Sequence, residues 1–444
     1  MFSTEKLTAH IINTRYEDLP PSVSRSVSLC LLDLIGVACA GYNTASATSM
    51  RRTIKSLIKP GPATVWFSSD KLLPCGAALA NSSSASALDL DDGHRQAAGH
   101  PGASIIPAAI AQGQAVQASW QGIVKAVVLG YETGCRISKA RDFEKLSTMS
   151  TGRWCAYGAA VAAGTLRGLE PVPMAQAIAI AGVQSPELSA AGYSVVMGNH
   201  VKEGIPWATM TGMVAVDLAQ SGLSGPLDIL DNPDYYDSDI IFDGWGEKWA
   251  VDEIYFKPYA CCRWIHAAID ALTALISENS IVSGEIEAVD VFTFRRALML
   301  SNETDPCSVE GAQYSLPFCL ALAAVEGIHA LQPVKPEHLG RPDLVEFASK
   351  VSLAVDDELD ALFPGKTPAR VRILYRGKQY RKIIYDPWGD PDNPFSQDDL
   401  EEKFISATRP YLDSHVQEKI LECIRDWGNV KLAGLLDMLG YRFP

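Results

Sequence analysis

Residues 87–104 limit the possible folds of this chain more than any other segment. Three carboxylates, two imidazoles and one guanidinium fall within twelve residues of the sequence Ala-Leu-Asp-Leu-Asp-Asp-Gly-His-Arg-Gln-Ala-Ala-Gly-His-Pro-Gly-Ala-Ser. Small apolar and serine residues precede and follow the cluster. Ionisable groups at the edge of a core cost free energy unless they are paired or take part in chemistry. We therefore interpret this segment as a candidate functional site.

The chain that leads into this segment is predicted to be helical. Residues 77–88 contain no proline and form a run of small residues. If the helix continues to Asp92, Asp89 and Asp92 share one face and Asp91 points elsewhere. Gly93 is typical of a helix end.

The second half of the segment is predicted to be a loop followed by another helix. His94 and Arg95 lie on the loop, and Pro101 suits the first turn of the next helix. His100 then stands at a helix N-terminus, which favours anions and disfavours an imidazolium. The segment can therefore supply a proton acceptor, a proton donor and a cation for a carboxylate.

The composition excludes several classes of protein. A length of 444 residues predicts two domains, or one large domain with an insert. The net charge of −14 argues against a general nucleic-acid binder, which needs a basic stripe. The ten cysteines have no regular spacing, which predicts a reduced, cytoplasmic chain without disulfide bonds or a zinc site. The longest apolar stretch near the start, residues 29–42, contains Asp33 and is too short to span a membrane.

Hydrophobic periodicity predicts helices at both ends of the chain and a mixed region between them. Residues 285–387 combine strand and helix patterns, including a β-hairpin around Arg376-Gly377-Lys378. Residues 400–439 return to helical patterns. We therefore predict a mainly α fold with two domains: a large all-α helical domain of residues 1–265 with 395–444, and a smaller inserted α/β lid domain of residues 266–394.

Five more residues are candidates for a site that binds anions or moves protons. Arg153 stands at the start of a small-residue helix, where its charge opposes the helix dipole unless an anion lies there. Lys202 lies on a polar loop ahead of a helix. Aromatic neighbours suggest that Lys257 is partly buried, which would lower the pKa of its amine and make it a usable base. Arg263 and His266 share a face if a helix begins before them.

Several short motifs occur in a specific order along the chain. They are Leu88-Asp89-Leu90-Asp91-Asp92 with His100-Pro101-Gly102, Thr151-Gly152 leading into Gly158-Ala159-Ala160, Lys202 before its helix, Phe256-Lys257-Pro258-Tyr259 with His266, and Ala312-Gln313-Tyr314-Ser315. With these motifs, nearly the full length of the chain resembles the MmgE/PrpD family, which includes 2-methylcitrate dehydratase, cis-aconitate decarboxylase and iminodisuccinate epimerase. The resemblance implies a helical domain with an α/β lid, a homodimer, a cleft between the domains, and no metal or organic cofactor.

The resemblance also implies a substrate class and a set of site residues. The implied substrates are small di- and tricarboxylates, whose charges need fixed cations. The base would be Lys257, or His100 paired with Asp89, and the acid would be His94 or His266. The expected catalytic residues are Asp89, His94, His100, Lys202, Lys257 and His266. The expected substrate-binding residues are Asp92, Arg95, Arg153, Tyr259, Cys262 and Arg263.

Four positions depart from the family pattern. Met149 stands where many members have a histidine two residues before the Thr-Gly pair. Cys262 stands where the decarboxylases have a histidine, and Gly93 and Phe318 stand where they carry a hydroxyl. These departures weaken the case for decarboxylation of cis-aconitate and leave the acid–base framework intact.

Elimination, decarboxylation and epimerisation share a carbanion-like intermediate, so the sequence predicts the type of step better than its outcome. Our leading hypothesis is a cofactor-independent lyase that dehydrates a citrate-like hydroxy tricarboxylate. The alternatives are an epimerase or isomerase of a dicarboxylate, a cis-aconitate-type decarboxylase and a non-catalytic homologue. Asp89-Leu90-Asp91-Asp92 also matches the acid motif of helical terpene cyclases, but its Ala- and Ser-rich surroundings do not favour an aromatic pocket. A metal site at Asp91, Asp92 and His94 is disfavoured.

Overall fold

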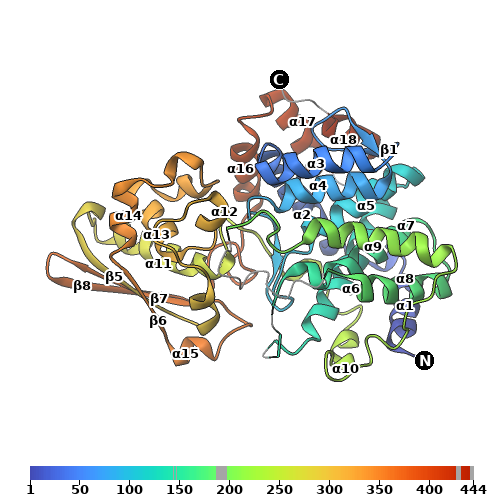
Figure 1. Cartoon of the computed structure of the whole chain (residues 1–444), viewed down its shortest axis with the longest axis horizontal. Helices are drawn as coiled ribbons and strands as arrows, with labels where there is room; N and C mark the ends of the chain where they lie inside the picture. Colours follow the sequence, from blue (N-terminus) through green and yellow to red (C-terminus); the bar gives the residue numbers. More distant parts are fainter. Residues whose placement is uncertain (144, 147, 187–197, 427–431, 441–444) are drawn as a thin grey trace.

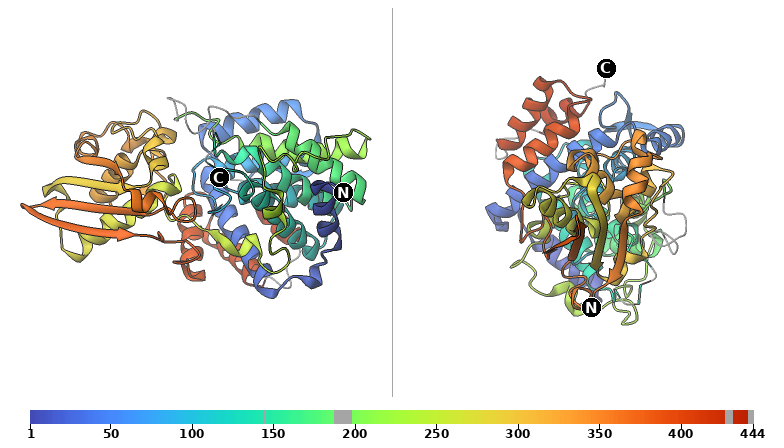
Figure 2. Two further views of the ribbon diagram at one scale, coloured as in Figure 1. Left: turned by 90° about the horizontal axis from the view of Figure 1, so that it is seen from below. Right: turned by 90° about the vertical axis from the view of Figure 1, so that its left-hand side faces the viewer.

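The computed structural model describes the chain except residues 144, 147, 187–197, 427–431 and 441–444. About 56% of the residues are helical, which confirms the prediction of a mainly α protein. Figure 1 shows a larger helical part on the right and a smaller part with a β-sheet on the left. The left view of Figure 2 shows the same separation into two parts, with strands of the sheet at the far end of the smaller one.

The helical part takes its elements from both ends of the chain. Its helices are α1 (Ser3–Asn13), α2 (Pro21–Gly41), α3 (Ala45–Leu57), α4 (Pro74–Ser86), α5 (Gly102–Val116), α6 (Trp120–Lys139), α7 (Cys155–Leu166), α8 (Pro171–Gln184), α9 (Ile205–Gln220), α10 (Ser238–Phe242), α16 (Gln397–Thr408), α17 (Ser414–Arg425) and α18 (Leu432–Leu439). Short strands β1 (Pro60–Thr64) and β2 (Lys71–Leu72) pair with each other, as do β3 (Gly93–His94) and β4 (Ile254–Tyr255).

Small residues allow the central helices of this part to approach closely. Gly130 of α6 and Gly158 of α7 face each other, and a Cβ on Gly130 would lie 2.9 Å from the Gly158 carbonyl oxygen. The same Cβ would lie 2.5 Å from the side chain of Ile105 on α5. Glycine is therefore needed where these three helices meet.

Helix α2 shows how the apolar N-terminal stretch is used. Among the described helices, it alone is long and apolar enough to cross a membrane by length and composition, and it extends beyond the apolar stretch predicted from the sequence. However, 78% of its most apolar window is buried inside the protein. Its one charged residue within this core, Asp33, pairs at 2.5 Å with Lys403 of α16. The helix is therefore packed as a core helix, and the C-terminal segment supplies the charge that compensates for its aspartate.

The smaller part combines a four-stranded sheet with helices. Its elements are α11 (Arg263–Glu278), β5 (Ile286–Thr293), α12 (Val309–Ala312), α13 (Leu316–Val325), α14 (Pro342–Ala348), β6 (Val351–Val355), α15 (Asp357–Asp360), β7 (Ala369–Tyr375) and β8 (Lys378–Ile384). The strand order is β6-β5-β7-β8, with β5 and β6 parallel and the other neighbours antiparallel. Strand β7 alternates buried and half-buried residues, as expected for a sheet with one face covered, here by α11.

Each part has a hydrophobic core of its own. The larger core draws on residues from Leu7 to Ile254 and from Leu400 to Leu439, and the smaller core on residues from Tyr259 to Tyr375. The exact limits of the two domains and the role of the smaller one as a lid stay predictions. The chain passes between the parts near residues 255–263 and 385–396, and both crossings lie beside the acidic segment described next.

Candidate active site

The acidic loop (residues 87–92) follows the end of α4 and is not helical. Helix α4 ends at Ser86, and Asp89 has a left-handed backbone with φ of 52°. The prediction that the helix continues to Asp92, and that Asp89 and Asp92 share a helix face, is therefore wrong. Asp89, Asp91 and Asp92 are nevertheless all buried. Left-handed backbone at a residue other than glycine is uncommon and is often found at functional sites.

Gly93 connects the acidic loop to the crossing between the two parts. In the β3–β4 pair, Gly93 lies opposite Tyr255. A Cβ on Gly93 would lie 2.2 Å from the Tyr255 hydroxyl oxygen, so no side chain fits there. The chain continues from Tyr255 to Lys257, whose side chain reaches Asp89 in the acidic loop.

Lys257 and Asp89 form a fully buried ion pair. Lys257 Nζ donates to Asp89 Oδ1 at 2.7 Å, and the lysine side chain has no exposed surface. Burial alone would lower the pKa of Lys257, but the Asp89 and Asp91 carboxylates raise it above its ordinary value. Burial would likewise raise the pKa of Asp89, but the Lys257 and Lys202 charges bring it below its ordinary value. The predicted lowering of the Lys257 pKa is therefore wrong, because its partner is a carboxylate. The role of Lys257 as one of the two candidate bases stays a prediction.

His100 lies between two carboxylates at the wall of a cavity. Its Nδ1 donates to the Asp92 carbonyl oxygen at 2.8 Å, so a second proton goes to Nε2. Nε2 lies 3.6 Å from Asp89 Oδ1 and 3.7 Å from Glu203 Oε1. Burial alone would lower the pKa of His100, but the nearby carboxylates, that of Asp91 first, raise it above its ordinary value. His100 is thus arranged as a proton donor.

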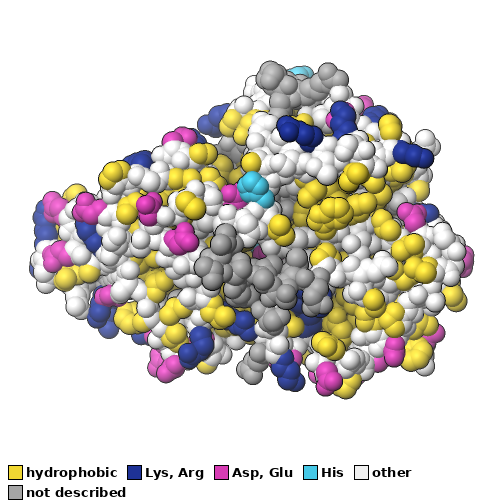
Figure 3. Space-filling view, viewed as in Figure 1, with side chains coloured by type: hydrophobic (Ala, Val, Ile, Leu, Met, Phe, Trp, Pro, Cys, Tyr) yellow, Lys and Arg dark blue, Asp and Glu magenta, His cyan; other side chains and the backbone are white. Residues whose placement is uncertain are grey.

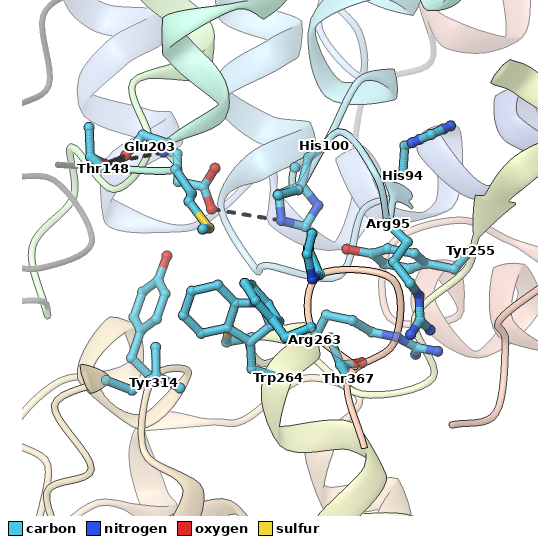
Figure 4. Close-up of a pocket in the computed structure, with 18 residues that line it drawn as sticks. His94, Arg95, His100, Thr148, Glu203, Tyr255, Arg263, Trp264, Tyr314 and Thr367 are labelled. Carbon is cyan, nitrogen blue, oxygen red and sulfur yellow. Dashed lines mark hydrogen bonds and ion pairs between the residues drawn. The ribbon is translucent and has the colours of Figure 1, made fainter. Parts of the chain in front are cut away.

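Glu203 completes this arrangement and was not among the residues predicted from the sequence. Its Oε2 accepts hydrogen bonds from the backbone N–H and the hydroxyl of Thr151 at 2.9 and 2.5 Å. Its Oε1 faces His100 across the top of the cavity in Figure 4. Thr151 Oγ1 also accepts the backbone N–H of His100 at 3.1 Å. The carboxylate, the threonine and the histidine are therefore held as one network.

Lys202 is anchored at the end of α4. Its backbone is left-handed, with φ of 49°. Its Nζ donates to the Ser86 and Ala87 carbonyl oxygens, both at 3.2 Å, and to Gln313 Oε1 at 2.8 Å. A cation at the carbonyl end of a helix is favourable. The three N–H groups of Lys202 are all used, so it contributes charge rather than a free donor.

Two guanidinium groups converge at the other end of the cavity. Arg95 and Arg263 both pair with the buried carboxylate of Asp390, which follows the hairpin of the smaller part. Nη1 of Arg95 and Nε of Arg263 are buried without a hydrogen-bond partner in the described part of the chain. Two cations share one carboxylate, which leaves one excess positive charge for an anion.

Several predicted residues lie behind this cavity rather than in its wall. His266 is fully buried, with Nδ1 3.1 Å from Nη1 of Arg263 and Nε2 donating to the Cys261 carbonyl oxygen. Burial and the Arg263 charge hold the pKa of His266 well below its ordinary value. The Tyr259 ring lies tilted against His266, and its hydroxyl donates to Asp270. His266 therefore contacts Arg263, and Tyr259 contacts His266. The predicted roles of these two residues in proton transfer and substrate binding stay predictions.

The remaining predicted residues are dispersed. His94 lines the cavity but points away from His100 in Figure 4, and its Nε2 lies 3.4 Å from Glu253. Arg153 lies in the turn before α7, near Arg141, and is outside the lining of the cavity.

Asp92 does not face the cavity either, although it was predicted to bind substrate. It accepts from the Tyr131 hydroxyl at 2.7 Å and the Gly102 N–H at 2.9 Å. Burial raises the pKa of Asp92 to about 7. Its role is therefore to join the acidic loop to α5 and α6.

The wall of the cavity also contains the two positions that depart most from the family pattern. Met149 and Cys262 both line it. Burial raises the pKa of the Cys262 thiol, so this side chain is not an acid at neutral pH. Apolar or inert groups thus stand at both positions.

Among the described residues, one group could hold a metal ion. Ligand atoms of Asp89, Asp91 and His100 lie within 4.8 Å of one another. The Lys257 ammonium already lies 2.7 Å from Asp89 and provides a positive charge there. The two carboxylates are therefore better suited to the Lys257 ammonium and the His100 imidazolium than to a divalent cation, which the nearby lysine would repel.

Comparison with known proteins agrees with these motifs. Residues 5–244 match the model of the MmgE/PrpD N-terminal domain, and residues 259–429 match that of the C-terminal domain. The chain is 26% identical over 416 residues to a cis-aconitate decarboxylase of Aspergillus terreus, with 85% of this chain and 83% of the relative covered. It is 24% identical over 458 residues to the cis-aconitate decarboxylase-like protein oryM of Aspergillus oryzae, covering 94% and 92%. It is 23% identical over 474 residues to the cis-aconitate decarboxylase of Homo sapiens, covering 98% and 94%.

Proposed function

Because the chain belongs to the MmgE/PrpD family, we propose that it is a lyase that moves a proton at a carbon next to a carboxylate of a small polycarboxylate. The relatives named above are lyases, which supports this class of reaction. The favoured reaction is dehydration of a citrate-like hydroxy acid.

The observation that carries this proposal is the His100–Glu203 pair. A proton donor and a carboxylate lie 3.7 Å apart and face the same cavity. Elimination of water needs both groups, a base for the carbon-bound proton and an acid for the leaving hydroxyl.

The steps then balance as follows. Glu203 takes the proton from the carbon next to the carboxylate, and the electron pair forms the C=C bond as the hydroxyl leaves with the proton from His100 Nε2. The products are an unsaturated polycarboxylate and water. A proton transfer from Glu203 to His100 restores the starting state. The guanidinium end, Arg95 with Arg263, stabilises the charge that develops on the substrate carboxylate.

Decarboxylation is the second candidate, and the names of the relatives favour it. Loss of CO₂ from a substrate needs a proton donor for the resulting carbanion but no base. Met149 and Cys262, which both line the cavity, weigh against it. By the family resemblance, Met149 stands where many members have a histidine, and Cys262 stands where the decarboxylases have one.

NMR in deuterated water with citrate, 2-methylcitrate and cis-aconitate separates these reactions. Dehydration gives an olefinic signal from the hydroxy acids, whereas decarboxylation of cis-aconitate gives a product that is one carbon shorter. We expect Glu203→Gln to lower dehydration by about 10²-fold or more, as for loss of a general base. Thr165→Val, which removes a buried hydroxyl on α7 outside the cavity, serves as the control. An active Glu203→Gln enzyme, or absence of turnover and deuterium exchange with every substrate, would overturn the dehydratase proposal.

A further inference from the structure

We propose that the substrate carries an uncharged aliphatic arm, and that this arm lies in a second cavity between α3, α4 and α9. This inference rests on the proposed function, because it describes the remainder of the molecule whose carboxylate end lies near Arg95 and Arg263. It assigns a second binding subsite and restricts the class of substrate.

The second cavity adjoins the first, because three residues belong to the walls of both. We call the first the arginine cavity and the second the serine cavity. His100, Glu203 and Tyr314 line both of them. A molecule whose reacting carbon lies next to His100 and Glu203 can therefore extend in both directions.

The serine cavity differs in chemistry from the arginine cavity. Away from the acidic loop and from the charged residues discussed below, its wall consists of hydroxyl groups of α3 and α4 and of apolar side chains, which include Met50 and Trp207. Figure 3 shows hydrophobic rather than charged side chains on the surface between α3 and α9. Trp207 is 47% exposed and stands at the outer end. An apolar wall of this kind gains free energy by covering CH₂ groups.

The charges in the serine cavity disfavour a further carboxylate there. Among the described residues that line it, Lys202 is the lysine or arginine present, and each of its three N–H groups already has an acceptor. His200 pairs with Glu310 at 3.5 Å. The carboxyl groups of Asp89, Asp91 and Glu203 also line this cavity. His100 also lines it, but its Nε2 already faces Asp89 and Glu203. A further carboxylate would therefore meet like charges while both cations are engaged by other acceptors, whereas an alkyl or acyl arm would not.

A binding series tests the arm without requiring turnover. Isothermal titration with succinate, 2-methylsuccinate, 2-butylsuccinate and 2-hexylsuccinate measures how affinity depends on chain length. We expect affinity to rise about two- to fourfold for each CH₂ that enters the cavity. Pentane-1,2,5-tricarboxylate, in which an arm of the same length ends in a carboxylate, should bind more weakly than 2-butylsuccinate.

Variants locate the effect in the serine cavity. Ser49→Trp places a large ring at its wall and should bring the ratio of hexyl to methyl affinity close to one. Ser56→Trp is the matched control, because Ser56 lies two turns along the same helix and outside the lining. Trp207→Ala removes an exposed wall residue and should lower the same ratio several-fold, which keeps the test valid if Ser49→Trp does not fold.

The outcomes separate this inference from the proposed function. Three results would contradict the proposed arm, even if citrate is dehydrated. They are an affinity that does not change with chain length, a hexyl-to-methyl affinity ratio that is unchanged in both cavity variants, and tighter binding of the tricarboxylate than of 2-butylsuccinate. A rising affinity that Ser49→Trp removes would support the arm. If hydroxylated members of the same series are then not dehydrated, the reaction proposed above is wrong and the subsite stands.

Discussion

The buried pair of Lys257 and Asp89 supports the site through charge balance. Both side chains are almost fully buried, and each shifts the other toward its charged form. Lys257→Met leaves the Asp89 carboxylate without its nearest cation, and we expect the free energy of unfolding to fall by about 3–5 kcal/mol. Urea denaturation at pH 7 measures this change.

The double variant Lys257→Met with Asp89→Asn provides the control for that experiment. Because it removes both charges, it should recover much of the stability lost in the single variant. If the single and double variants are equally unstable, packing around the lysine chain matters more than its charge.

Asp92 predicts a pH dependence of stability. Its pKa is about 7 in the folded protein and 3.8 in an unfolded chain. The folded state therefore binds this proton more tightly, so the Asp92 contribution to stability falls as the pH rises from about 4 to about 7 and is lowest above 7. We expect Asp92→Asn to be more stable than the wild type at pH 8, with a smaller difference at pH 4. Thermal unfolding at both pH values measures this difference, and an equal effect of the substitution at the two pH values would contradict the shift.

Sequence reasoning found most residues of the site but not their roles. Asp89, His100, Lys202 and Arg263 were selected, and the structure brings them to one region. The lowered pKa expected for Lys257 was wrong, because residue spacing does not show that a carboxylate lies 2.7 Å away. Glu203 was missed although it follows Lys202 directly. Its proximity to His100 depends on the Thr151 contact across the fold, for which the sequence offers no signal.

At the level of elements, the close contact between α6 and α7 predicts that a glycine-to-alanine substitution changes stability in opposite directions at two positions of α6. Gly130→Ala would place a Cβ 2.5 Å from Ile105 and 2.9 Å from the Gly158 carbonyl, and we expect a loss of about 1–3 kcal/mol. Gly122→Ala on the same helix meets its nearest atom at 3.5 Å and should add up to about 1 kcal/mol through helix propensity. Chemical denaturation of both variants tests this contrast, and a similar loss in each would contradict it.

Helix and strand patterns were predictable where packing follows local periodicity. Helix α2 and the β7–β8 hairpin agree with the sequence patterns, because proline marks the start of the helix and Arg376-Gly377 forms the turn. The end of α4 was not predictable. The side chain of the left-handed Asp89 is held by Lys257, which lies far away in the sequence, and faces His100, eleven residues further along the chain.

On the scale of the whole molecule, the site lies where two separately packed parts meet. The helical part supplies His100, Glu203 and Arg95. Arg263, at the start of α11 in the smaller part, completes the cationic end, and Asp390 pairs with both arginines. The affinity for a ligand should therefore depend on the contacts that hold the two parts together. The homodimer implied by the family stays a prediction, which sedimentation velocity would test.

Asp390 is the residue through which that junction can be tested. It is 1% exposed and is shared by Arg95 of the helical part and Arg263 of the smaller part. Asp390→Asn leaves two buried guanidinium groups without their counter-charge, and we expect a loss on the order of 3 kcal/mol in the free energy of unfolding. Asp386→Asn is the matched control, because Asp386 pairs with the more exposed Lys366 and should cost less than about 1 kcal/mol. An added dicarboxylate such as succinate can replace the missing charge, so it should raise the Tm of Asp390→Asn more than that of the wild type. Equal shifts in Tm would mean that the two arginines do not form the carboxylate-binding end of the site.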